Sequence, residues 1–119
     1  MKEDLVYVEH VLLCISRVET YTAGNRQMFL ETLMVQDAVI RNLQVLAESS
    51  QRISATVKSK YPNVDWRGLA GFRNLLAHGY LAIDIVKVWD LIDTHLAPLK
   101  LSMGRIQADL ISQYGTDIA

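Results

Sequence analysis

The chain has 119 residues, of which 50% are hydrophobic, and its 12 Lys and Arg against 13 Asp and Glu give a net charge of −1. This composition is typical of one globular domain over residues 1–119 and excludes a disordered chain, which would be less apolar and more highly charged. The longest stretch without a charged residue, 74–83, is too short to cross a membrane as a helix. No signal-like segment follows the acidic N-terminus, so we expect a cytoplasmic protein with no membrane partner.

Apolar residues recur every three or four positions along nearly the whole chain, a spacing that predicts helices. The first predicted helix extends from Leu5 to Val18, and the segment 22–25 interrupts the pattern. Asn25 is expected to cap a second helix. That helix carries one face of residues at helical spacing: Phe29, Leu33, Gln36, Ile40, Leu43 and Ala47. The helical pattern then weakens over the polar, serine-rich residues 48–60.

A third main helix is predicted after a loop at 61–63, because a proline disfavours helix in the residue before it. Asp65 can cap this helix, which should start at Trp66 and stop at Gly79, a residue suited to the left-handed position after a helix. His78 would then be its last residue.

The next predicted helix starts after Asp84, another good N-cap, and seven of the ten residues at 83–92 are apolar. Such a helix is buried on more than one side or lies at a subunit interface. Pro98 is expected to end or kink it, with one more helical segment around 99–110. No strand pattern competes, so the predicted fold class is all-α, an antiparallel helix bundle.

A metal site and a cofactor are not expected. Cys14 is the only cysteine, lies among apolar residues and is expected in the core. His10 and His95 lie on separate predicted helices without further ligand-type residues at metal-binding spacing. Other residues are expected as packing anchors or core fillers: Trp66, Trp89, Met28, Met34 and Met103.

The charge is distributed unevenly along the chain. Residues 52–80 hold five basic residues and one acidic residue, for +4, and the remainder carries −5. A weakly acidic protein is a poor general binder of nucleic acid, but a local basic segment can still hold a phosphate. A solvated charged face is the alternative interpretation.

Four chemically capable side chains fall within eight residues: Arg73, Asn74, His78 and Tyr80. Arg73 and His78 lie about 140° apart around a straight helix. They could still converge, because His78 is at the helix end and Arg73 is long. Alternatively, His78 caps the helix and Arg73 pairs with an acid.

The string Arg73-Asn74-x3-His78-x-Tyr80 resembles the RN-x3-H-x-Y signature of HEPN-domain ribonucleases, and it is most similar to the HepT toxins of toxin–antitoxin pairs. The resemblance extends over residues 66–72, to Asp84 and Trp89, and to essentially the whole chain. It implies a two-fold HEPN dimer that cleaves RNA, such as mRNA or tRNA, without a metal.

The resemblance also implies roles for these side chains. His78 would transfer protons, Arg73 would bind the phosphate and Asn74 would orient the phosphate or His78. One histidine cannot easily serve as acid and base in one turnover, so a homodimer would supply a second His78 and Arg73.

In HepT-like proteins, the tyrosine that matches Tyr80 is adenylylated by the partner antitoxin, a minimal nucleotidyltransferase (MntA-like). The alternative for Tyr80 is a half-buried tyrosine that packs the loop onto the bundle. Two other functions stay open: a non-catalytic module that presents nucleotide or RNA to that nucleotidyltransferase, and a plain structural bundle.

Overall fold

The computed structural model describes residues 2–78 and 83–118, except for the side chains of 77, 78 and 115–118. The described residues include no strand, and the predicted all-α class is confirmed. The helices are α1 (Lys2–Thr22), α2 (Arg26–Glu31), α3 (Leu33–Arg52), α4 (Ala55–Lys60), α5 (Trp66–His78) and α6 (Ile85–Ile118). Within this described part, no helix is both long enough and apolar enough to traverse a bilayer.

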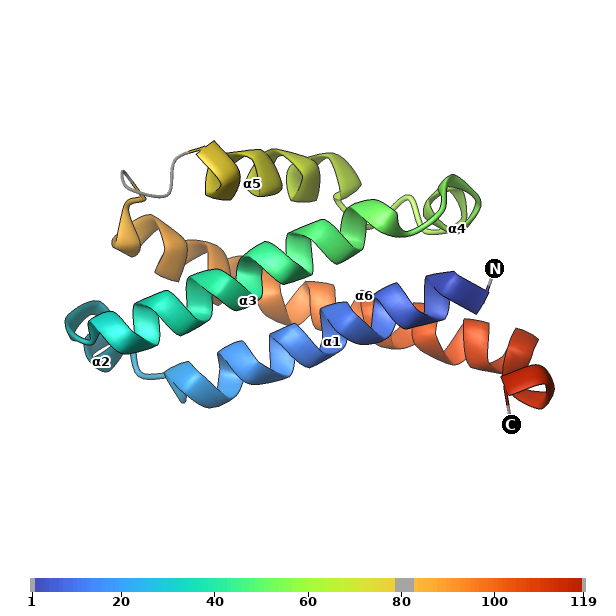
Figure 1. Cartoon of the computed structure of the whole chain (residues 1–119), viewed down its shortest axis with the longest axis horizontal. Coiled ribbons are helices and arrows are strands. Elements are labelled where there is room, and N and C mark those ends of the chain that lie inside the picture. The colour runs from blue at the N-terminus through green and yellow to red at the C-terminus, as the bar shows by residue number, and fades with distance from the viewer. Residues whose placement is uncertain (1, 79–82, 119) are drawn as a thin grey trace.

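The long helices form an antiparallel bundle (Figure 1). α1 packs against both α3 and α6, and α5 packs on α3. Successive long helices reverse direction, so the two ends of the chain lie at the same end of the bundle (Figure 1). This arrangement confirms the predicted antiparallel bundle and leaves the outer side of α5 facing solvent.

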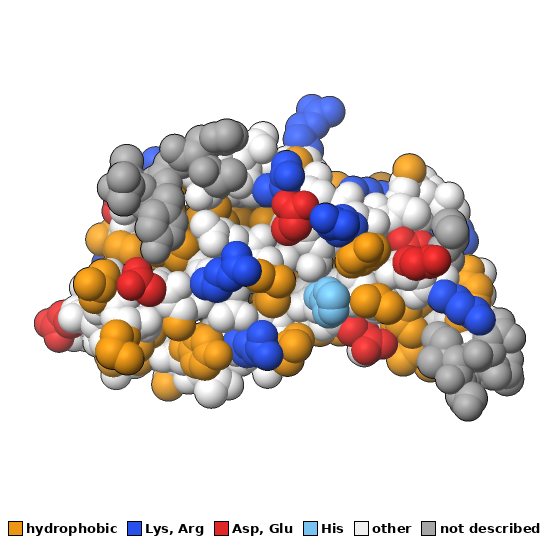
Figure 2. Space-filling view, viewed as in Figure 1, with side chains coloured by type: hydrophobic (Ala, Val, Ile, Leu, Met, Phe, Trp, Pro, Cys, Tyr) orange, Lys and Arg blue, Asp and Glu red, His pale blue; other side chains and the backbone are white. Residues whose placement is uncertain are grey.

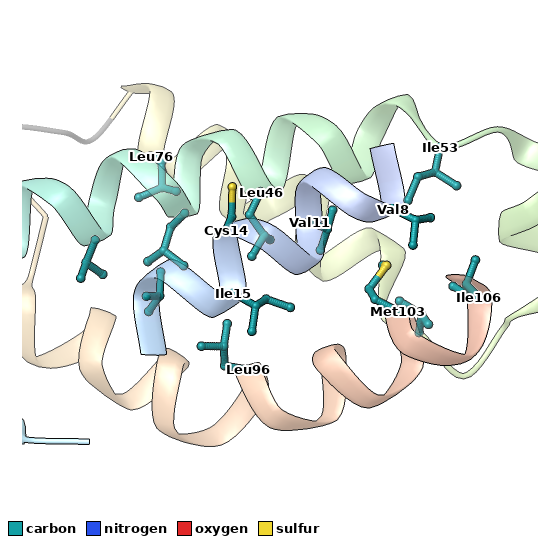
Figure 3. Close-up of a cluster of buried hydrophobic side chains, with 14 of the residues drawn as sticks. Val8, Val11, Cys14, Ile15, Leu46, Ile53, Leu76, Leu96, Met103 and Ile106 are labelled. Atoms are coloured by element: carbon teal, nitrogen blue, oxygen red, sulfur yellow. The ribbon is translucent and has the colours of Figure 1, made fainter. Parts of the chain in front are cut away.

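The core is made mainly of apolar side chains from α1, α3 and α6, to which α2 adds Phe29, α4 adds Val57 and α5 adds Leu76 (Figure 3). Cys14 is 2% exposed, which confirms its predicted place in the core, and burial raises the pKa of its thiol. Met103 is fully buried, as predicted. Trp89 is also buried and lies 5.5 Å from the ring of Phe29, measured between centroids, so its role as a packing anchor is confirmed.

The predicted second helix is two helices, because the chain breaks at Thr32. Asn25 caps α2 as expected, its Oδ1 accepting from the Met28 amide at 3.0 Å. Thr32 has extended backbone angles, and Gln36 Nε2 donates to the carbonyl of Phe29 at 2.9 Å across the break. The change of direction leaves the start of α3 outside the core. The prediction of Met34 as a core residue is therefore wrong: its side chain is 83% exposed.

A buried carboxylate joins α1 to the end of α3. Asp4 is 2% exposed, and its two oxygens accept from Ser54 N at 2.7 Å and Ser54 Oγ at 2.9 Å. The same Ser54 hydroxyl accepts from the Val57 amide and so caps α4. Burial raises the pKa of Asp4 and the hydrogen bonds from Ser54 lower it, and overall the pKa is lowered. The polar segment 48–60 is thus ordered by a contact with the N-terminal helix.

Pro98 was expected to end or kink its helix, and the structure rules out the first of these. α6 extends without interruption from Ile85 to Ile118, with Pro98 inside it. A proline removes one helical hydrogen bond and crowds the preceding turn. Buried residues on both sides of it, Leu96 and Met103, are part of the core. Their burial holds both halves of α6 against the bundle and offsets the cost of the proline.

Candidate functional site

The first turn of α5 is held by side chains around the preceding loop. Asp65 Oδ1 accepts from the Gly68 amide at 2.8 Å, which confirms the predicted cap. A Cβ at position 68 would lie 2.7 Å from Asp65 Cγ, so a larger residue there would displace the capping carboxylate. Trp66 Nε1 donates to the carbonyl of Tyr61 at 3.0 Å, and Lys58 Nζ lies 5.7 Å from the centre of the Trp66 ring. These contacts fix where α5 begins.

Tyr61 also ties this loop to α6. Its hydroxyl donates to Asp109 Oδ2 on α6. Burial, the hydrogen bond and the negative charge of Asp109 together raise the pKa of Tyr61 to about 12. The hydroxyl therefore keeps its proton under ordinary conditions, and the loop before α5 stays linked to the longest helix of the bundle.

The two sides of α5 have different surroundings. Leu76 is 1% exposed, and Leu69 and Phe72 pack against the core. Arg73 and Asn74 lie on the solvent side, and the Arg73 side chain is 45% exposed. The described part of α5 extends to His78, and the predicted stop at Gly79 lies outside the described residues. The helix therefore presents Arg73 and Asn74 to solvent, while its apolar residues attach it to α3 and the core.

Arg73 is paired with an acid that the sequence did not single out. Its Nε donates to Glu48 Oε2 on α3 at 2.5 Å. On the other side of the carboxylate, Arg52 Nε lies 3.7 Å from Glu48 Oε1. Figure 2 shows basic and acidic side chains gathered on this face, where α3 and α5 run side by side. We refer to these three residues as the Arg52–Glu48–Arg73 cluster.

The electrostatics of the cluster favour an anion-binding surface. The hydrogen bond from Arg73, followed by the positive charges of Arg73 and Arg52, lowers the pKa of Glu48, which is therefore a carboxylate at neutral pH. Two guanidinium groups and one carboxylate leave a net charge of +1. All three side chains are substantially exposed, at 44% for Glu48 and 59% for Arg52. A phosphate could approach the arginines without any rearrangement of the core.

The structure describes only some of the other predicted site residues. Asn74 is exposed beside Arg73 on α5. The side chain of His78 and the whole of Tyr80 lie outside the described residues. The predicted convergence of Arg73 with His78 and the predicted place of Tyr80 in the loop therefore stay predictions.

A second feature is a hollow of about 370 Å³ beneath α5. It lies among α3, α5 and α6, and its lining is mainly apolar, with Leu46, Phe72 and Leu99 among the residues that face it. His95 borders it as well. Among the side chains that the structure describes, no three or more His, Cys, Asp or Glu lie together as metal ligands would.

Comparison with known proteins points to one family. The profile of the family "Ribonuclease HepT-like" matches residues 11–106. "Probable ribonuclease HepT" of Thermococcus cleftensis is 30% identical over 98 residues, which cover 79% of this chain and 86% of that protein. No solved structure shows a significant match.

Two proteins of Methanocaldococcus jannaschii are also similar. "Putative RNase MJ1380" is 35% identical over 72 residues, or 60% of this chain and 66% of that protein. "Gamma-glutamylcyclotransferase and putative RNase MJ0434" is 27% identical over 112 residues, or 92% of this chain. The chain spans half the length of that second relative. The family match covers the segment with Arg73, Asn74, His78 and Tyr80.

Proposed function

The chain belongs to the Ribonuclease HepT-like family, and from this premise we propose that it is a metal-independent ribonuclease that uses Arg73 and His78. The family match supports ribonuclease activity. The observation that carries the assignment to this site is the exposed Arg73 on α5, held beside α3 and open to a phosphate. We propose further that the protein is the toxin of a toxin–antitoxin pair.

The proposed reaction uses the ribose 2′-hydroxyl of the RNA as nucleophile. The 2′-oxygen attacks the adjacent phosphorus as a base takes its proton, and the bond from phosphorus to the 5′-oxygen breaks. An acid gives the leaving 5′-oxygen a proton. His78 is the residue type suited to both proton transfers near neutral pH. Arg73 stabilises the negative charge on the pentacoordinate phosphorus with its fork of N–H donors.

A two-fold dimer would complete the site, because two proton transfers are shared best between two histidines. Support for an interface comes from the apolar residues that a single chain leaves exposed on α6, among them Val86 at 45%. Light scattering should then report twice the 13.4 kDa mass of one chain. A monomer at micromolar concentration would contradict this part of the proposal.

Control by a partner is the last part of the proposal. A minimal nucleotidyltransferase antitoxin would attach AMP to Tyr80, two residues beyond His78. The added phosphate would compete with RNA for Arg73 by charge and by occupied space. The test is the intact mass of the purified protein after incubation with the partner and ATP. The mass should rise for the wild type and stay unchanged for Tyr80→Phe.

The experiment that tests the activity itself is RNA cleavage by the purified protein with a chelator present. We expect the wild type to cleave in EDTA, and His78→Ala to lose about 10²–10⁴-fold in rate through lost proton transfer. Arg26→Ala, an exposed arginine at the start of α2, is the matched control and should cleave normally. Undiminished cleavage by His78→Ala would contradict the proposal, and no cleavage by the wild type would favour the non-catalytic binding module.

A further inference from the structure

Glu48 is the one acid in direct contact with Arg73 among the described side chains, and the proposed chemistry gives it no role. It lies on α3, 25 positions before Arg73, so the contact arises only from the packing of α5 on α3. A negative charge beside the proposed phosphate-binding arginine should weaken phosphate binding. Its presence at this position therefore calls for a function that compensates for this loss.

The atom through which Arg73 makes the contact indicates that function. The guanidinium donates through Nε, the nitrogen nearest the aliphatic stem. A carboxylate at Nε fixes the plane of the guanidinium and leaves the paired Nη groups at its far end as donors for a second acceptor. Those two groups match two oxygens of one phosphate.

We propose that Glu48 is a positioning residue for Arg73, which holds the guanidinium so that its Nη edge faces the scissile phosphate of RNA. This inference rests on the proposed ribonuclease function. Glu48 does not touch the RNA. Its negative charge lowers the affinity for the RNA phosphate, but it fixes the orientation of the Arg73 guanidinium. A fixed arginine stabilises the transition state better than a mobile one.

The alternative is an ordinary surface ion pair that fastens α5 to α3. Exposed ion pairs contribute little to stability, and here both side chains are nearly half exposed. α5 is already attached to the core by Leu76, Leu69 and Phe72. The fold therefore does not depend on Glu48, and its removal should be visible in catalysis while the melting temperature stays unchanged.

The chain offers a matched control for this experiment. Glu19 on α1 accepts from Lys100 Nζ on α6 at 2.9 Å, and its side chain is 45% exposed, against 44% for Glu48. Glu19→Gln makes the same change of charge and shape as Glu48→Gln on another pair of helices. Any effect of net charge alone should appear equally in both variants.

The experiment measures kcat, KM and melting temperature for the wild type, Glu48→Gln, Glu48→Asp and Glu19→Gln. We expect Glu48→Gln to lower kcat by about 10-fold, because Arg73 loses its fixed orientation. KM should fall by about 2- to 5-fold, since a negative charge is removed beside the RNA. Glu48→Asp keeps the charge and should recover part of kcat. Glu19→Gln should resemble the wild type, and the melting temperatures should agree.

A second measurement reports the contact without requiring activity. The Nε–H resonance of Arg73 in a nitrogen-15 spectrum, assigned by its loss in Arg73→Ala, should be protected from exchange in the wild type and exposed in Glu48→Gln. An active wild type with an equally fast Glu48→Gln would overturn the positioning role alone. The same would follow if kcat fell only in step with melting temperature. A wild type that cleaves no RNA would contradict the proposed function as well.

Discussion

Asp4 on α1 and Glu48 on α3 each contact a residue that is distant in the sequence, but in different ways. Asp4 is 2% exposed and accepts two hydrogen bonds from Ser54. Glu48, six residues before Ser54, has a side chain that is 44% exposed and accepts from Arg73, which is 45% exposed. Both contacts link separate helices, but only the first is closed to water.

The difference in exposure separates stability from function. If Asp4 loses its partner, a buried polar group is left without a hydrogen bond, and the fold bears the cost. If Glu48 or Arg73 loses its partner, water replaces it at little cost. Arg73 can therefore bind a substrate phosphate through its Nη groups without disturbing the bundle. We expect substitution of Asp4 to change stability, and substitution of Glu48 or Arg73 to change catalysis.

The largest expected effect is on catalysis, at Arg73. Arg73→Ala should reduce the rate of RNA cleavage by about 10²–10³-fold, because it removes charge stabilisation of the transition state. Its melting temperature should match that of the wild type, since the side chain lies outside the core. Cleavage rates and thermal unfolding curves from the same preparation check both halves. A marked loss of stability would remove the distinction between the two carboxylates.

The next effect is on stability, at Asp4. Asp4→Ala should lower the free energy of unfolding by about 1–3 kcal/mol, because Ser54 is left with an unsatisfied amide. Glu3→Ala, at the exposed neighbouring acid of α1, is the control and should change little. Urea unfolding measures both variants. If Asp4→Ala were as stable as Glu3→Ala, the buried contact would not support the fold as we describe.

A smaller effect is the pH dependence that Asp4 imposes. Its pKa is lowered in the folded chain, so its contribution to stability is complete above the unfolded value of about 3.9 and is lost as the pH falls through the folded value. The difference in unfolding free energy between wild type and Asp4→Asn should therefore shrink as the pH is lowered from about 6 to about 3. A difference that grew on acidification would show that the sign is wrong.

The smallest expected effect is at the exposed pair of Glu19 and Lys100, which joins α1 to α6. Lys100→Ala should change the free energy of unfolding by less than about 1 kcal/mol and leave RNA cleavage unchanged. Calorimetry and the cleavage assay report the two quantities. A loss of activity here would mean that exposed ion pairs on this bundle affect catalysis whatever their position.

The parts of the fold that local patterns encode were predictable from the sequence. The caps at Asn25, Asp65 and Asp84 are confirmed, each side chain accepting from an amide two or three residues further on. The start of α5 at Trp66 also agrees with the pattern. Capping depends on residues within one turn of each other, so one stretch of sequence contains the information.

The features that the sequence did not reveal depend on contacts between distant residues. Nothing near Asp4 indicates that Ser54, 50 positions away, would donate to it, and nothing near Arg73 identifies Glu48. The break at Thr32 depends on Gln36 reaching back to the carbonyl of Phe29. Continuation of α6 through Pro98 depends on core packing on both sides of the proline. Helical periodicity carries none of this information.

We propose that this chain cleaves RNA by attack of the ribose 2′-hydroxyl at the Arg73 site without a metal. The most direct measurement is the chemistry of the RNA ends that the purified wild type produces in EDTA. We expect a 2′,3′-cyclic phosphate on one product and a 5′-hydroxyl on the other. A 3′-hydroxyl with a 5′-phosphate would contradict it, because those ends require water to be the nucleophile.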